Sequence, residues 1–298
     1  MKKNKNIFNK IMLGGNLFSY AAKNKEVIKI CELALDYGIN SIDTANVYSN
    51  GKSEKIISNV IRKCRDKWFI ASKIGHKSNM QKNNLNNPKK IIKNLDESLI
   101  RLKTDYVDLL QLHHYDPTTP AEEIIFCMNN LIKKGKILSY GVSNYNLDNL
   151  KQITKHKKCK ILTNQVKCNL IYNNAISEFK SLKKKIKLIS YSTLHRGLLS
   201  NRYLDKNYRS FRYKNSKNIK KDLNVKFYKK IKIINNFSKK YENMTIERLS
   251  ILYLLKFDFF FKVIVGIRSQ DQLKKLFSKK FSNVNNLDFR NLEKKLSF

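Results

Sequence analysis

Short apolar runs alternate with longer amphipathic stretches along almost the whole chain, and this alternation constrains the fold more than any other feature. The runs are rich in Val, Ile and Leu, as strands buried on both faces are, and segments with a helical repeat lie between them. Eight strands are expected, at Ile11–Leu13, Ser41–Asp43, Phe69–Lys73, Val107–Leu112, Tyr140–Val142, Leu162–Val166, Leu188–Tyr191 and Val263–Val265. Repeated βα units of this kind predict an α/β fold, a single (β/α)8 TIM barrel.

The segments between the predicted strands carry apolar faces of helical spacing. Val27, Ile30 and Ala34, for example, fall on one face of a helix. Ser53 stands just before another helical repeat and is expected to mark its start, and Pro88 is expected in the first turn of a further helix.

The length of the chain suits one barrel. Its 298 residues are close to what an eightfold α/β barrel needs, and no linker rich in Pro, Gly or Ser divides them, so one domain over residues 1–298 is expected. The longest irregular stretch, Leu194–Asn224, follows the seventh strand. We expect it to form a loop over the end of the barrel at which the strands finish.

Several features bear on where the protein resides. No stretch approaches the roughly 18 consecutive apolar residues of a membrane span, and the basic N-terminus is not followed by the long apolar run of a secretory signal. The five cysteines include no CxxC pair, so neither a disulfide framework nor a zinc site is expected. A reducing, cytoplasmic location fits best.

The formal net charge of +38 is extreme and raises nucleic acid or an anionic surface as a partner. The lysines, however, recur on nearly every predicted helix and do not gather in one tail. No interleaved aromatic and basic motif is present. We therefore expect solvated helix faces and no specific nucleic-acid function.

Polar residues in apolar surroundings fall at the carboxyl ends of the predicted strands, which in a (β/α)8 barrel share one mouth. They are Asp43, Lys73, His113, Ser143, Asn144, Gln165 and Tyr191. Singly, each has an ordinary structural explanation, such as helix capping for Asp43 or a water-facing strand end for Lys73. Together a carboxylate, an ammonium and an imidazole, with the nearby phenol of Tyr48, favour a proton-transfer site.

These residues lie in segments that resemble the aldo-keto reductase family. The segment IDTANVYSNGKSE, at residues 42–54, is similar to that family's pattern of Asp, four residues, Tyr, a glycine-containing turn and Ser-Glu. Further similar segments follow in the family's order: ASKIG, DYVDLLQLHH, GVSNY, NQV, ISYSTLHRGLLS and VIVGIRSQDQL. The resemblance extends from about Ile11 to Leu276.

The resemblance implies a catalytic tetrad of Asp43, Tyr48, Lys73 and His113. Tyr48 would donate a proton to a carbonyl oxygen that receives charge from hydride transfer. The ammonium of Lys73 is expected to lower the pKa of the Tyr48 phenol, and Asp43 to keep Lys73 charged. His113 would orient or polarise the carbonyl. The expected substrate is a small molecule with an aldehyde, ketone or sugar carbonyl.

The resemblance also implies NADP(H) as the cofactor, and no metal. Ser143, Asn144 and Gln165 would bind the nicotinamide carboxamide, and Tyr191 would stack on its ring. The last βα unit would hold the adenosine phosphate through Gly266, Arg268, Ser269 and Gln272. A bidentate contact from Arg268 to a ribose 2′-phosphate favours NADPH over NADH.

Alternatives stay open at this level. The same residues suit a sugar or alcohol dehydrogenase working in the oxidative direction, and some barrels of this family resemble nicotinamide-sensing channel subunits. A charge-driven nucleic-acid binder would lose its affinity steeply with salt and ignore NADPH. The substrate's identity and the oligomeric state are left open, because specificity is expected to rest on variable loops.

Overall fold

The chain forms a closed barrel of eight parallel strands in sequential order, with β1 pairing to β8. The computed structural model describes residues 5–19, 21–77, 83–182, 185–205, 217–277 and 287–297. The strands are β1 (Ile11–Gly14), β2 (Ser41–Asp43), β3 (Phe69–Ile74), β4 (Val107–Leu112), β5 (Ile137–Ser143), β6 (Ile161–Lys167), β7 (Lys187–Tyr191) and β8 (Phe260–Val265). The predicted (β/α)8 barrel is therefore confirmed.

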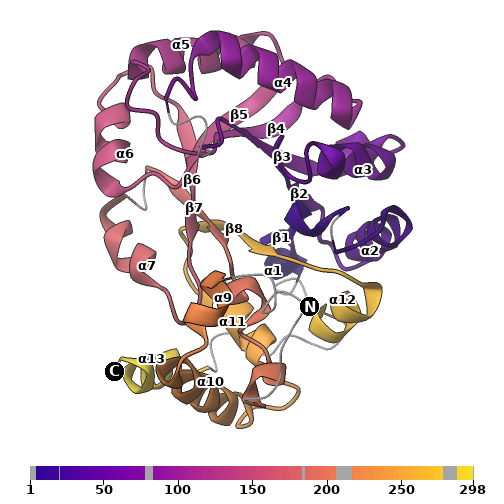
Figure 1. The fold of residues 1–298 in the computed structure, drawn as a ribbon, viewed down its shortest axis with the longest axis vertical. Helices are drawn as coiled ribbons and strands as arrows, with labels where there is room; N and C mark the ends of the chain where they lie inside the picture. The colour runs from indigo at the N-terminus through magenta and orange to yellow at the C-terminus, as the bar shows by residue number, and fades with distance from the viewer. Residues whose placement is uncertain are drawn as a thin grey trace.

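Helices surround the strands, as Figure 1 shows. The α-helices are α1 (Lys5–Asn9), α2 (Asn24–Asp36), α3 (Lys52–Ile61), α4 (Pro88–Leu102), α5 (Ala121–Lys133), α6 (Leu147–Thr154), α7 (Asn174–Glu178), α9 (Lys217–Asp222), α10 (Val225–Ser238), α11 (Ile246–Leu255), α12 (Gln270–Phe277) and α13 (Phe289–Leu296). Short 3-10 turns are η1 (Gly15–Leu17), η2 (Arg65–Lys67), η3 (Lys180–Leu182), η4 (His195–Gly197) and η5 (Asn201–Leu204). The predicted face of α2, including Val27, Ile30 and Ala34, is buried.

All eight predicted strands are present, but β5 and β8 begin earlier than expected. β5 starts at Ile137 and β8 at Phe260. The sequence conceals both starts because a polar residue interrupts each apolar run: Ser139 in β5 and Lys262 in β8. In the structure Ser139 donates a hydrogen bond to the carbonyl of Asp108, 2.6 Å away, so the strand continues through it.

One of the two predicted helix starts is correct. Pro88 is the first residue of α4, and Asn87 caps the helix by accepting a hydrogen bond from the backbone N–H of Lys89 at 3.0 Å. The expectation that Ser53 marks the start of α3 is wrong, because the helix begins at Lys52 after Gly51. The Ser53 hydroxyl serves a tertiary contact and donates to the carbonyl of Gly15 at 2.9 Å.

The barrel interior is apolar at mid-height and polar at both ends. Its middle is filled by a small cluster consisting of Met12, Ala71, Leu109, Ile189 and Ile264. At the amino-terminal end, buried Lys262 donates to the carbonyl of Asn9 at 2.6 Å and to the hydroxyl of Ser41 at 2.7 Å. Desolvation by burial lowers the pKa of Lys262 to about 8. The larger core lies between the strands and the helices.

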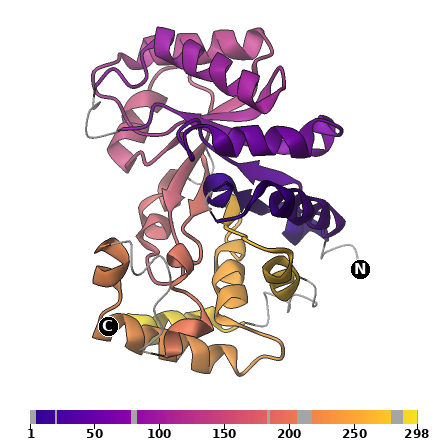
Figure 2. The same ribbon diagram turned by 45° about the vertical axis from the view of Figure 1, so that its right-hand side comes forward.

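The long stretch predicted to be irregular, Leu194–Asn224, contains η4, η5 and α9, while residues 206–216 lie outside the described residues. After it, α10 packs against α13 on the outside of the barrel, as Figure 2 also shows. Within the described ranges, every helix is too short or too polar to cross a membrane. All five cysteines lie in these ranges and are free thiols.

Candidate active site at the carboxyl ends of the strands

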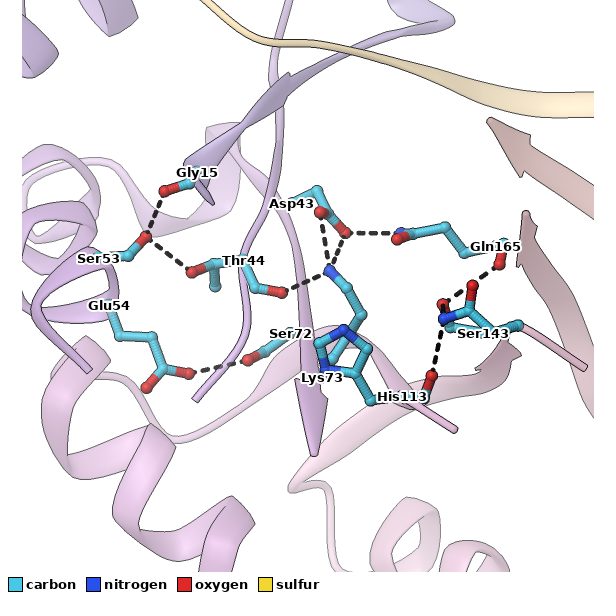
Figure 3. Close-up of polar contacts among 11 residues, drawn as sticks. Gly15, Asp43, Thr44, Ser53, Glu54, Ser72, Lys73, His113, Ser143 and Gln165 are labelled. Atoms are coloured by element: carbon cyan, nitrogen blue, oxygen red, sulfur yellow. Dashed lines mark hydrogen bonds and ion pairs between the residues drawn. The ribbon is translucent and has the colours of Figure 1, made fainter. Parts of the chain in front are cut away.

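A buried ion pair joins the ends of β2 and β3. The Lys73 ammonium lies 2.7 and 2.8 Å from the two carboxylate oxygens of Asp43, and it also donates to the carbonyl of Thr44 at 2.8 Å (Figure 3). Lys73 is 1% exposed and Asp43 is 3% exposed. Because all three Lys73 donors have acceptors, the ammonium is held in one position by both strand ends.

The ionisation of Lys73 is set by two opposing effects. Burial disfavours the ammonium, but the interactions with Asp43 and with Tyr48 together outweigh burial and raise the pKa of Lys73 above its ordinary value. Lys73 therefore remains a cation at neutral pH. This agrees with the charge state expected from the sequence.

Tyr48 stands beside this pair on the connection between β2 and α3. The Lys73 ammonium lies 5.0 Å from the centre of the Tyr48 ring. As expected, the Lys73 ammonium lowers the pKa of the phenol, but burial raises it more and Asp43 raises it further, so the net shift is upward and not towards working pH. The phenol is therefore protonated at neutral pH, the form in which it is a proton donor.

His113 follows β4 and completes the group at the mouth. Its ring centre lies 6.2 Å from that of Tyr48. Burial and the nearby charge of Lys73 lower the pKa of His113 to about 2, so the imidazole is neutral. Two further histidines pack on it: the His114 ring is stacked at 5.0 Å, and the His76 ring lies edge-on at 4.8 Å. His76 did not emerge from the sequence, because no motif contains it.

The predicted nicotinamide residues, which lie on β5, β6 and β7 or directly after β5, form one hydrogen-bonded group. Asn144 donates to the carbonyl of His113 at 3.0 Å and accepts from the Tyr191 hydroxyl at 2.8 Å. The Ser143 hydroxyl donates to the Gln165 carbonyl at 3.2 Å. The Gln165 side-chain amide donates to Asp43 at 2.8 Å, so this residue joins the two groups (Figure 3).

The remaining predicted cofactor residues lie separately, on the connection from β8 to α12. The backbone N–H of Arg268 donates to the side chain of Gln272 at 3.0 Å, and the Ser269 hydroxyl accepts from the backbone of Gln272 at 3.2 Å. Arg268 is exposed. Gly266 packs so closely on Leu17 that a side chain at this position would lie 2.9 Å from it.

A second buried network lies behind the Tyr48 connection, and the sequence did not reveal it. Fully buried Glu54 accepts from the Ser72 hydroxyl at 2.8 Å and from the Arg101 side chain at 2.7 Å. Ser53 is 2.9 Å from the Thr44 hydroxyl, in addition to its bond to Gly15 (Figure 3). In the sequence, only the Ser53-Glu54 pair that ends the segment at residues 42–54 pointed to this network. Arg101, the partner of Glu54, lies 47 residues away along the chain.

The sequence model of the aldo/keto reductase family matches residues 10–296. The aldo-keto reductase YhdN of Bacillus subtilis (strain 168) is 34% identical over 194 residues, covering 63% of this chain. This chain spans 57% of the length of that relative.

Solved structures share the fold. A glycerol dehydrogenase from Gluconobacter oxydans has a TM-score of 0.79 at 24% identity, with 97% of this chain and 91% of that chain covered. An aldo/keto reductase from Klebsiella pneumoniae, solved in complex with NADP and acetate, has a TM-score of 0.70 at 19% identity, with 96% and 90% covered.

Proposed function

Because this chain belongs to the aldo/keto reductase family, we propose that it is an NADPH-dependent oxidoreductase that reduces the carbonyl of an aldehyde, a ketone or a sugar. The observation that carries the proposal is the buried Asp43–Lys73 ion pair beside the protonated phenol of Tyr48. A buried ion pair is weak evidence for stability. At a barrel mouth, beside a proton donor, it suits the stabilisation of developing negative charge.

The described residues fit a nicotinamide dinucleotide. The exposed guanidinium of Arg268 has no hydrogen bond or ion pair with the described residues, so it is available for a 2′-phosphate. The Tyr191 ring, held through its hydroxyl by Asn144, would stack on the nicotinamide. Gln165 donates its amide N–H to Asp43, which leaves its amide oxygen to accept from the carboxamide.

The proposed chemistry assigns one task to each residue of the tetrad. A bound reduced nicotinamide supplies the hydride. Tyr48 donates its phenolic proton to the carbonyl oxygen as negative charge develops there, and the ammonium of Lys73 stabilises the phenolate that remains. Asp43 holds Lys73 charged, and the neutral ring of His113 donates an N–H to the same oxygen.

A dehydrogenase working in the oxidative direction is the second candidate, because the same residues serve both directions. In reduction the phenol of Tyr48 gives its proton to the carbonyl oxygen, and in oxidation the phenolate beside the Lys73 ammonium takes it back.

The test is NADPH oxidation by the purified protein against a panel of aldehydes, ketones and sugars, with NADH measured alongside. We expect turnover with at least one class of carbonyl, a preference for NADPH, and loss of that preference in Arg268→Ala. Tyr48→Phe keeps the ring, so it should fold and bind NADPH while turnover falls by at least about 100-fold. NADPH binding without any turnover in the unmutated protein would instead support the sensory subunit.

A further inference from the structure

Glu54 is a buried carboxylate outside the tetrad. It is fully buried in the first turn of α3, and its two oxygens accept from Ser72 on β3 and from Arg101 on α4. Removing a carboxylate from water is costly, and a buried ion pair often contributes no more to stability than apolar residues of the same volume. Stability alone therefore does not explain the Glu54–Arg101 pair, and the parts of the structure that the pair holds in place do.

Arg101 lies directly against the turn that follows Tyr48. A side-chain carbon on Gly51 would lie 2.7 Å from the Arg101 Cδ and 2.9 Å from its Nε, so only glycine admits this approach. The turn comprises Ser49, Asn50 and Gly51, all left-handed, with φ of 50°, 54° and 78°. The backbone N–H of Gly51 donates to the carbonyl of Tyr48 at 3.1 Å. Arg101 thus supports a strained turn that carries the proposed proton donor.

The same network reaches the strand that carries the proposed ammonium. Ser72, the partner of Glu54, directly precedes Lys73 and is fully buried on the opposite side of β3. Glu54 therefore joins the turn after Tyr48, through Arg101, to the strand residue before Lys73 (Figure 3 shows the Glu54–Ser72 part).

We propose that Glu54 and Arg101 are positioning residues that set the Tyr48 phenol relative to the Lys73 ammonium. The proposal rests on the proposed function for its kinetic consequence. Glu54 is fully buried, and the partners of the Arg101 side chain among the described residues are Glu54, Glu97 and Ser98, so neither residue belongs to the proposed catalytic or cofactor-binding group. Their effect passes through the left-handed turn on one side and through β3 on the other.

The test replaces the pair without leaving a buried charge. In the double variant Glu54→Gln/Arg101→Met both partners are neutral and close to the original length, so the protein should fold. Arg62→Met, an exposed arginine at the end of α3, is the matched control. We expect kcat to fall by about 10-fold or more, because small misplacements of a reacting group are that costly, while the Kd for NADPH is unchanged. The control should leave both unchanged.

Two readouts separate positioning from a general structural role. In a Tyr48→Phe background, replacing the pair should cause no further loss of turnover; an equal loss in both backgrounds would overturn the proposal. Independently of activity, the carbon-13 resonance of the Tyr48 ring Cζ at neutral pH should shift in the double variant and not in Arg62→Met. An unmoved resonance in a folded double variant would overturn the proposal, whether or not the unmutated protein reduces carbonyls.

Discussion

Two buried lysines at opposite ends of the barrel show how surroundings decide ionisation. Lys73 has Asp43 as its partner, and its pKa is raised. Among the described residues, Lys262 has only the neutral oxygens of Asn9 and Ser41 at hydrogen-bond distance, and burial lowers its pKa to about 8. Burial penalises both ammonium groups, and at Lys73 the interactions with Asp43 and Tyr48 outweigh that penalty.

The tetrad predicts an unusual pH profile. Because the pKa of His113 is about 2 and that of Tyr48 is above its ordinary value of 10, neither group changes its proton between about pH 5 and about pH 9. We expect kcat for carbonyl reduction to show no step near about pH 6.5, where an ordinary histidine titrates, and to decline only as the Tyr48 phenol ionises in the alkaline range. Steady-state kinetics with saturating NADPH across this range would check it. A step near about pH 6.5 would mean that an ionising histidine takes part.

The sequence identified the residues at the mouth but not their electrostatics. Asp43, Lys73 and His113 could be found because each ends or follows an apolar strand. The raised pKa of Tyr48 could not, because burial of the phenol depends on the packing of the whole mouth. The bond from Gln165 to Asp43 joins residues 122 positions apart, which strand patterns do not specify.

At the scale of elements, the strands were predictable and the turn after Tyr48 was not. Apolar runs of strand length identify buried parallel strands, and all eight were found. The start of α3 was misplaced because Ser53 has the character of a helix cap, whereas the chain enters the helix through left-handed Gly51. The contact between Gly51 and Arg101 is tertiary. It explains why residue 51 is a glycine, which the pattern of the helix does not.

Gly51→Ala should therefore affect both stability and activity. The left-handed backbone penalises alanine, and its side-chain carbon would meet Arg101 Cδ at 2.7 Å. Gly135→Ala is the matched control, since Gly135 is also left-handed, at φ 69°, with nothing within 4 Å of the added carbon. We expect both variants to lose about 1 to 3 kcal/mol of unfolding free energy from strain, with the larger loss in Gly51→Ala. Urea unfolding measures the loss, and only Gly51→Ala should lower kcat; equal kinetics in both variants would contradict the role of the turn.

At the scale of the whole molecule, Lys262 makes the stability of the barrel depend on pH. Its folded pKa, about 8, lies below its ordinary value of 10.5, so between these values the unfolded chain binds more protons than the folded one. The penalty for burying the ammonium is present in full below about pH 8 and is relieved as pH rises towards about 10.5.

Lys262→Met lacks this group and isolates its contribution. We expect the unfolding free energy of the unmutated protein, relative to Lys262→Met, to increase by on the order of 1 kcal/mol per pH unit between about pH 8 and about pH 10. Effects of other titrating groups cancel in the difference. Urea unfolding of both proteins at several pH values measures it, and a difference that stays constant with pH would show that Lys262 titrates normally.

The closure of the barrel at its first and last strands also determines when the fold can be completed. Lys262 bonds to the carbonyl of Asn9 across 253 residues, and β1 lies between β2 and β8. While the ribosome is still making the chain, β1 has an unpaired edge until β8 emerges, after many seconds at ordinary rates of translation. The sheet cannot close before β8 is made, so any sheet that the nascent chain forms until then keeps an unpaired edge at β1, and unpaired edges favour aggregation.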